Sequence, residues 1–493
     1  MASNTTYGDY MRPMPGGLRN IGRPLTVAAM CVLVAALFTC MANVLVGAGI
    51  LVVGEGVVFV LARRNREHRN IVDEQAERFA YRRQVRTGRG LYRSGLLAPV
   101  ASGACALPGV CSQVCLVEAL DAFGREFTLV RHGHTGEYSL LMACQPQGTA
   151  MADDQVEDSY VAAWAAVFES LADEDGVSQL AVSVDTAPDS GVRFRRGLRR
   201  RMVADAPELA ARCMRQVMDS YAVGGASTDT VLTLTFRPRD RRGAWLEPEE
   251  AARRIGQLIP SLCERVSEAG GGEPRCMRAD EIARMVARAY DPAMQDALET
   301  DPPAYVAFED AGPVAAEAGW DWYRHDSGLS RTWQMCDPPS SNVTADTLGA
   351  LLSPIGACDR KRVTLLFHAV PSDKTAWMAE QNRLKAVNQI RQEKRATMRS
   401  SKQRDQADRQ AAETADGAVI VFFGMLVTAT VMAGDDERDR LEAASHAVES
   451  AAGAARVNLR PCYAAQDTGF AAALPLGLDV RSYTPPRFAG LIG

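Results

Sequence analysis

A glycine followed by a lysine is the pairing that a phosphate-binding loop requires. The glycine lets the backbone approach the phosphates, while the lysine and a following hydroxyl bind phosphate and magnesium. The chain has five lysines, and none of them follows a glycine: Lys361, Lys374, Lys385, Lys394 and Lys402. The sequence also has no Gly-x-Ser-x-Gly elbow and no His-Glu-x-x-His zinc helix. We therefore expect a protein that is not an enzyme and that has no catalytic residue, cofactor or metal site.

The histidines are dispersed along the chain. His132 and His134 flank Gly133 in what reads as an exposed hairpin turn, although a metal or acid–base role is the alternative. His325 lies in segment 320–326, the most aromatic stretch of the chain. That stretch could be a stacking platform for single-stranded nucleic acid, but a sheet core or a protein-contact edge is the favoured interpretation. The twelve cysteines lack paired C-x-x-C spacing, which indicates buried thiols in a reducing compartment.

Arginines crowd segment 193–201, which reads as part of a long basic helix. A solvated helix is the usual explanation, and a docking surface for an acidic partner or anionic lipid is the alternative. The residues that we select as docking candidates are Arg195, Arg199, Arg200, Trp320 and Trp322. The overall net charge is only −5, so we expect no direct binding to nucleic acid.

Segment 25–62 has one charged side chain, that of Glu55. A single helix over this segment would be about 57 Å long at about 1.5 Å per residue, whereas a bilayer core is about 30 Å thick. Two helices with a break near Asn43 fit that thickness. Arginines flank both ends of the segment, which favours a transmembrane hairpin with both termini in the cytoplasm: Arg19, Arg23, Arg63, Arg64, Arg66 and Arg69. A signal peptide is the alternative, but its apolar region has only about 7–15 residues.

A carboxylate within a bilayer is costly, which makes Glu55 a candidate for function. Small residues beside it, Gly54 and Gly56, permit close helix packing. We expect Glu55 to face a partner helix during assembly, although a protonated side chain with no special role is the alternative.

The remaining sequence divides into an arm, a basic connection and a folded body. The arm is 1–24, and segment 63–105 is a basic juxtamembrane helix and linker that should lie near anionic lipid headgroups. Strand patterns at 114–122, 127–132 and 138–144 predict an antiparallel meander, and helices then alternate with short strands. This indicates an α+β body with mixed or antiparallel sheets and helices on one face.

We divide this body into two subdomains, 106–300 and 301–493. The predicted helices cover 154–172, 192–221, 248–269, 279–290, 344–352, 374–413 and 436–455. The helix at 374–413 is long and polar, and it could project as a coiled-coil-like partner helix.

Eight short motifs, each present once, follow one another along the chain. They are YGDYMRP at 7–13, LYRSG at 91–95, LPG at 107–109, TAPDSG at 186–191, AYDP at 289–292, DRKRVTLL at 359–366, GMLVTAT at 424–430 and AALPLG at 472–477. In this order the chain resembles an actinobacterial family linked to conjugation and type IV secretion. Its members join a PrgI-like two-helix membrane segment to a domain similar to the N-terminal part of the TrbE/CagE-type secretion ATPases.

The resemblance implies that the membrane anchor and the ATPase of the apparatus are separate polypeptides. In the full-length ATPases a similar LPG-like ending leads into the motor domain with its Walker loop, whereas this sequence stops soon after that ending. We therefore expect a non-catalytic scaffold in the bacterial inner membrane, which oligomerises within a complex. Its partners would be a separate Walker-type secretion ATPase and other membrane proteins of the apparatus. The alternatives are an accessory membrane component of a type VII secretion system and a membrane-tethered enzyme of unrecognised type.

Overall fold

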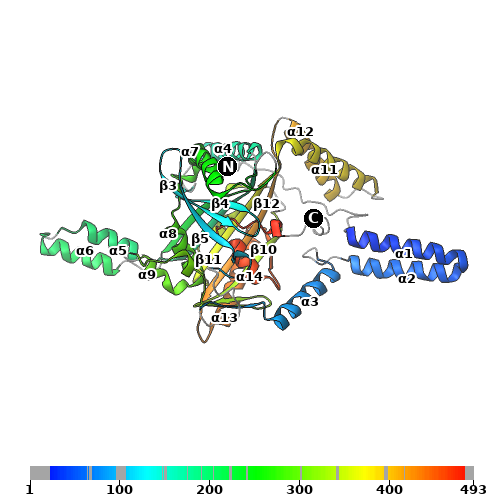
Figure 1. The fold of residues 1–493 in the computed structure, drawn as a ribbon, viewed down its shortest axis with the longest axis horizontal. Helices are drawn as coiled ribbons and strands as arrows, with labels where there is room; N and C mark the ends of the chain where they lie inside the picture. The colour runs from blue at the N-terminus through cyan, green and yellow to red at the C-terminus, as the bar shows by residue number, and fades with distance from the viewer. Residues whose placement is uncertain are drawn as a thin grey trace.

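A single large sheet forms the centre of the computed structural model, and helices extend from it on several sides (Figure 1). The structure describes residues 23–63, 65, 69–95, 107–146, 148, 153–174, 176–189, 191–203, 205–220, 225–239, 243–299, 303–339, 343–392, 398–415 and 417–483. The motif at 7–13, nearly all of the predicted arm and most of the predicted linker lie outside these residues.

The sheet has 13 strands, and every pairing in it is antiparallel. The strand order is β1-β8-β9-β10-β12-β11-β5-β6-β4-β3-β2, with β13 paired to β10 and β7 paired to β4. The strands are β1 (Leu91–Arg93), β2 (Val114–Leu120), β3 (Glu126–His132), β4 (Glu137–Cys144), β5 (Val177–Pro188), β6 (Ala226–Phe236), β7 (Arg275–Cys276), β8 (Ala315–Ala318), β9 (Tyr323–His325), β10 (Gly328–Asp337), β11 (Arg360–Ala369), β12 (Val421–Met432) and β13 (Asn458–Pro461). The predicted α+β class is therefore confirmed, and in place of the predicted mixed or antiparallel sheets there is one large antiparallel sheet.

The described helices fall into those that cover the sheet and those that project from it. They are α1 (Arg23–Ala42), α2 (Val44–Ala62), α3 (Ile71–Thr87), α4 (Asp154–Asp173), α5 (Val192–Arg201), α6 (Glu208–Ser220), α7 (Pro248–Val266), α8 (Ala279–Tyr290), α9 (Gln295–Glu299), α10 (Gly349–Leu352), α11 (Ser372–Gln392), α12 (Met398–Ala415), α13 (Glu437–Ala454) and α14 (Gln466–Ala473). The sequence predicted the bounds of α8 as they are observed.

Helices cover both faces of the sheet, so the expectation of helices on one face is wrong. On β4, Leu140 packs into one core with α4 and α7, whereas its neighbour Leu141 packs into another core with α8 and α14. Adjacent residues of a strand point to opposite faces, so these two cores lie on opposite sides of the sheet. Along β11 and β12 a third core, under α10 and α13, shares the face of α4 and α7.

The two predicted subdomains contribute to the same sheet. Strand β5 of the first half pairs with β11 of the second, from Lys361 opposite Thr186 to Phe367 opposite Leu180. At this junction the buried carboxylate of Asp185 accepts hydrogen bonds from Arg360 Nε and Arg362 Nη2, both at 2.8 Å. Burial alone would raise the pKa of Asp185, but the charges of the two arginines outweigh it and hold the pKa low.

Two helices that the sequence predicted as continuous are broken. The stretch 192–221 forms α5 and α6, because Pro207 precedes α6 and disfavours helical geometry at the residue before it. The long helix predicted at 374–413 is a pair, α11 and α12. Asn382 Nδ2 donates to Gln410 Oε1 at 3.2 Å, so the second helix folds back along the first instead of continuing it.

Candidate functional site

Helices α1 and α2 form a hairpin that stands away from the sheet (Figure 1). The chain turns at Asn43, the predicted position, where its side-chain oxygen accepts hydrogen bonds from the backbone N–H groups of Leu45 and Val46 at 3.0 and 3.4 Å. This capping satisfies donors that the first turn of α2 leaves open. Apolar side chains on the hairpin are widely exposed, with Phe38 70% and Leu45 85% accessible.

By length and composition, one described helix is able to cross a membrane. The qualifying window is Val44–Leu61 in α2, and the apolar part of α1, Thr26–Ala42, is shorter than that test requires. The hairpin geometry is therefore observed, whereas its transmembrane placement stays a prediction.

The three residues selected within the hairpin occupy different positions. A side chain added at Gly54 would overlap Val32 of α1, so this glycine makes the close approach between the two helices. A Cβ added at Gly56 would meet no other part of the described chain within 4 Å, so this glycine faces outward, and Glu55 beside it is half-buried. Gly54 thus serves packing within the chain, and a partner contact at Glu55 and Gly56 stays a prediction.

Trp320 connects α3, the predicted juxtamembrane helix, to the body. Its ring stacks on Tyr463 at a centroid distance of 5.3 Å and meets Tyr81 of α3 edge-on at 5.4 Å. Next to it, buried Arg460 donates from Nη2 to Glu77 of α3 at 2.6 Å. The docking candidate Trp320 is therefore engaged within the chain.

Trp322 is also half-buried, and it has its own contact within the body. The guanidinium of Arg438 lies 5.5 Å from its ring centroid.

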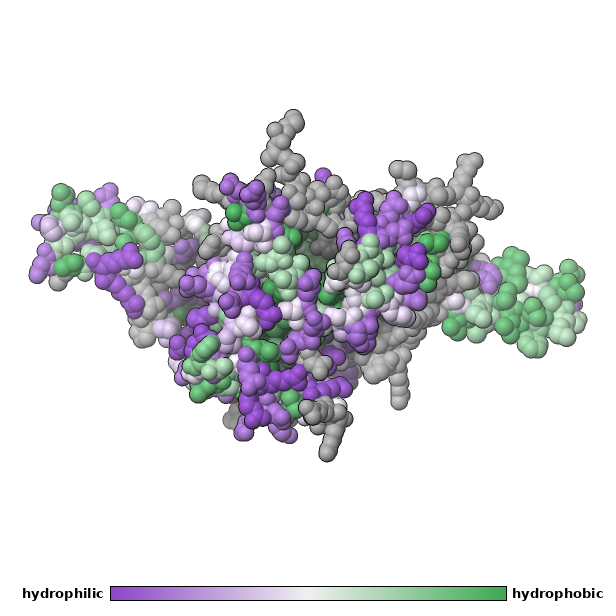
Figure 2. All heavy atoms as spheres, turned by 90° about the horizontal axis from the view of Figure 1, so that it is seen from above, coloured by the Kyte–Doolittle hydropathy of each residue, from purple (hydrophilic) through white to green (hydrophobic). Residues whose placement is uncertain are grey.

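Helices α5 and α6 project together from the body, at the end opposite the α1–α2 hairpin in both Figure 1 and Figure 2. We call this pair of helices the arm; it is distinct from the N-terminal segment 1–24. Arg199 and Arg200 are exposed on α5, and Arg195 is half-buried. On α6, Leu209 and Val217 are exposed at 72% and 45% although they are apolar. The arm therefore combines a basic helix with an amphipathic one, neither of which the body covers.

His132 does not lie in an exposed turn, and that prediction is wrong. It ends β3 and is buried, because segment 474–478 crosses this sheet face and covers it. Its Nε2 donates to the Leu476 carbonyl at 3.1 Å, and burial lowers its pKa to about 4. Its neighbour His134 is exposed, with Nε2 3.3 Å from Ser112 Oγ. His325 is fully buried, as a sheet core requires, and burial lowers its pKa to about 4 as well.

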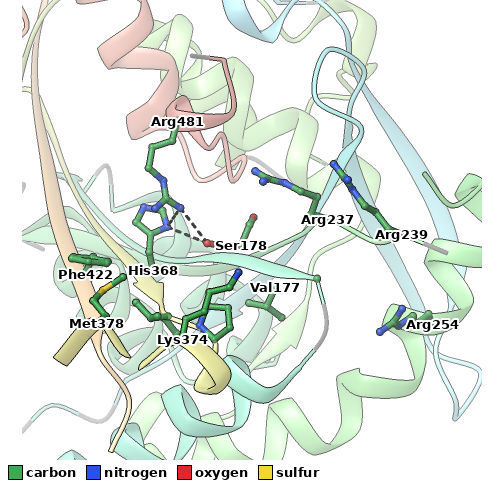
Figure 3. Close-up of a pocket in the computed structure, with 14 residues that line it drawn as sticks. Val177, Ser178, Arg237, Arg239, Arg254, His368, Lys374, Met378, Phe422 and Arg481 are labelled. Atoms are coloured by element: carbon green, nitrogen blue, oxygen red, sulfur yellow. Dashed lines mark hydrogen bonds between the residues drawn. The ribbon is translucent and has the colours of Figure 1, made fainter. Parts of the chain in front are cut away.

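A cavity of about 520 Å³ opens where β5, β6, β11 and β12 end beside α7 and α11 (Figure 3). Five cationic side chains, from four separate parts of the chain, line it: Arg237, Arg239, Arg254, Lys374 and Arg481. The sequence analysis missed this site, because its residues are spread from 176 to 481 and share no local motif.

Hydrogen bonds fix part of the cavity wall (Figure 3). Nδ1 of His368 lies 2.5 Å from Arg481 Nη2 and 3.1 Å from the carbonyl oxygen of Ser178, and the tautomer of the ring decides which of the two it bonds. Burial, assisted by the charge of Arg481, lowers the pKa of His368 and keeps it neutral. Asp479, which accepts a hydrogen bond from Arg481, is buried as well. The hydrogen bonds from Arg481 outweigh the effect of burial and lower the pKa of Asp479.

Comparison with protein-family models and with curated proteins finds no match for this chain. The resemblance to secretion-associated proteins therefore depends on the sequence motifs alone.

Proposed function

We propose that this chain is a non-catalytic docking component of a conjugative or type IV secretion-like apparatus. In this proposal the α1–α2 hairpin anchors it in the bacterial inner membrane, with the body and both termini in the cytoplasm. A separate Walker-type ATPase docks on the body. The observation that carries the proposal is that an apolar hairpin and a basic, amphipathic arm lie at opposite ends of the molecule (Figures 1 and 2).

The exposed apolar surface of the hairpin supports membrane anchoring. Side chains such as Met41 and Phe59, 84% and 77% accessible, would be costly in water, because soluble monomers rarely expose large contiguous apolar patches. Arginines on the exposed positions of α3 follow directly, which supports contact with anionic headgroups: Arg78, Arg82, Arg83 and Arg86.

The position of the arm favours a protein partner over lipid. If the hairpin is in the bilayer, the whole body separates α5 and α6 from that bilayer. Arg199 and Arg200 then face the cytoplasm, where an acidic protein surface is the complementary partner. The exposed side chains of Leu209 and Val217 would supply the apolar centre of such an interface.

The test is purification of the tagged full-length chain in mild detergent, followed by identification of the proteins that accompany it. We expect a Walker-type ATPase and other membrane components, and we expect the double variant Arg199→Glu, Arg200→Glu to lose the ATPase while keeping membrane partners. Arg253→Glu is the matched control, because Arg253 is 73% exposed on α7, away from the arm. Recovery of neither an ATPase nor a secretion component would refute the proposal. Equal ATPase recovery by all variants would refute the role of the arm.

A further inference from the structure

Among the residues that the structure describes, the cavity at the ends of β5, β6, β11 and β12 has more cations than carboxylates. Five cationic side chains line it, and three carboxylates pair with them. Glu137 lies 2.5 Å from Arg237, Asp479 lies 3.1 Å from Arg481 and Glu174 lies 3.7 Å from Arg254. The remaining two cations, Lys374 and Arg239, have no carboxylate within ion-pair distance among the described residues.

These two cations differ in how they are held. The guanidinium of Arg239 lies 4.6 Å from the ring centroid of Trp245, which leaves its N–H groups able to donate elsewhere. Lys374 is exposed in the first turn of α11. An excess of two positive charges matches a phosphate ester, which has a charge of about −1.5 to −2 at neutral pH. Arginine and lysine are also the side chains that bind phosphate best.

Two apolar side chains, those of Phe422 and Met378, also line the cavity. Phe422 and Met378 lie together at one side in Figure 3, whereas Arg239 and Arg254 lie at the other, with Val177 between them. Phe422 is the cross-strand neighbour of His368, so its ring borders the hydrogen-bonded wall of the cavity. An exposed aromatic ring beside a cationic wall suits a planar group that carries phosphate.

The volume gives a further constraint. At about 520 Å³ the cavity lies within the range of about 300–1,000 Å³ that small-molecule sites occupy. A nucleoside phosphate would fill a space of this size more completely than inorganic phosphate alone.

We propose that this cavity binds a nucleoside phosphate, with its base against Phe422 and Met378 and its phosphates toward Arg239 and Lys374. Within the described part of the chain, the lining has cations and one histidine but no carboxylate that could activate water, so the proposal is for binding without hydrolysis. This inference is independent of the docking role, since a scaffold with or without an ATPase partner could carry the site.

The test is equilibrium binding of ATP, GTP and inorganic pyrophosphate to the purified full-length chain in detergent. We expect at least one nucleotide to bind at least about tenfold more tightly than pyrophosphate, because only the nucleotide contacts Phe422. Lys374→Gln with Arg239→Gln should weaken nucleotide binding by about tenfold or more, and Phe422→Ala should weaken it by about tenfold.

Arg253→Gln is the control, since this exposed arginine lies on the same helix as Arg254 but does not line the cavity. Absence of nucleotide binding at millimolar concentration would overturn the inference. Equal affinity for pyrophosphate, or binding that the cavity variants leave unchanged, would overturn it too. A short-chain anionic phospholipid that displaces the nucleotide and binds more tightly would assign the cavity to a lipid headgroup instead.

Discussion

Gly477 allows the segment after α14 to lie flat on the sheet. The carbonyl oxygens of 473, 475 and 477 accept hydrogen bonds from Thr364 at 2.7 Å, Thr233 at 2.9 Å and Thr235 at 2.8 Å. Hydroxyls of the sheet thereby satisfy a buried segment that has no strand partner. Gly477 has φ = +76°, and a Cβ there would overlap Ser139 Oγ and lie 2.5 Å from Thr235 Oγ1.

We expect Gly477→Ala to destabilise the body by about 2–5 kcal/mol. The left-handed backbone costs a non-glycine residue about 1–2 kcal/mol. Forcing a methyl group into a close-packed site costs about 1–3 kcal/mol more. The substitution should lower the midpoint of urea unfolding, measured by the tryptophan fluorescence of the full chain in detergent. The slope of the unfolding free energy against urea concentration should not change.

Gly453→Ala is the matched control for this experiment. Gly453 lies in α13 with no heavy atom within 4 Å of an added Cβ, so alanine should be neutral or stabilise by up to about 1 kcal/mol. Ser139→Ala combined with Gly477→Ala should cost less than the sum of the two single changes, because it removes one of the overlapping atoms. A Gly477→Ala protein as stable as the parent would refute this account of the segment.

Three further outcomes follow from other parts of the molecule. His132 and His325 have pKa values of about 4 in the folded protein and 6.5 when exposed. The free energy of unfolding should therefore fall by about 3 kcal/mol for each histidine as the pH drops from 6.5 toward 4. A urea midpoint that does not change over that pH range would contradict this. Trp320→Ala should raise amide hydrogen exchange in α3 while leaving exchange in α8 unchanged, and unaltered α3 protection would show that the ring contacts do not hold the helix. Glu55→Leu should weaken recovery of membrane partners but leave membrane insertion intact, as measured by carbonate extraction, and unchanged recovery would contradict a partner contact at Glu55.

The sequence predicted elements best where one local pattern determined them. Alternation along 127–132 and 138–144 located β3 and β4, and the periodic apolar residues of 279–290 located α8 with its observed ends. It failed where distant segments decide the environment. His132 reads as a turn residue until Leu476, far along the chain, covers it.

The candidate sites, too, were predictable where a local pattern determines them and not where distant segments come together. The composition of the hairpin was evident from one stretch of residues, so its helices and its turn at Asn43 were predictable. Trp320 was selected as a docking candidate, because its partners within the chain, Tyr81 and Tyr463, are distant in sequence. The cationic cavity could not be predicted for the same reason, because its lining residues Arg237 and Arg481 are far apart in sequence and come together only in the folded sheet.

The pairing of β1 with β8 determines how the hairpin is mechanically coupled to the body. Just before β1, the helix α3 is held to the body through Glu77 and Tyr81, and β1 then joins the edge of the sheet over three residues. Helix α3 and β1, which follow the hairpin in the chain, are thus both fixed on the body. If the hairpin is a membrane anchor, the orientation of the body relative to the bilayer depends on α3 and on the three-residue β1–β8 ladder.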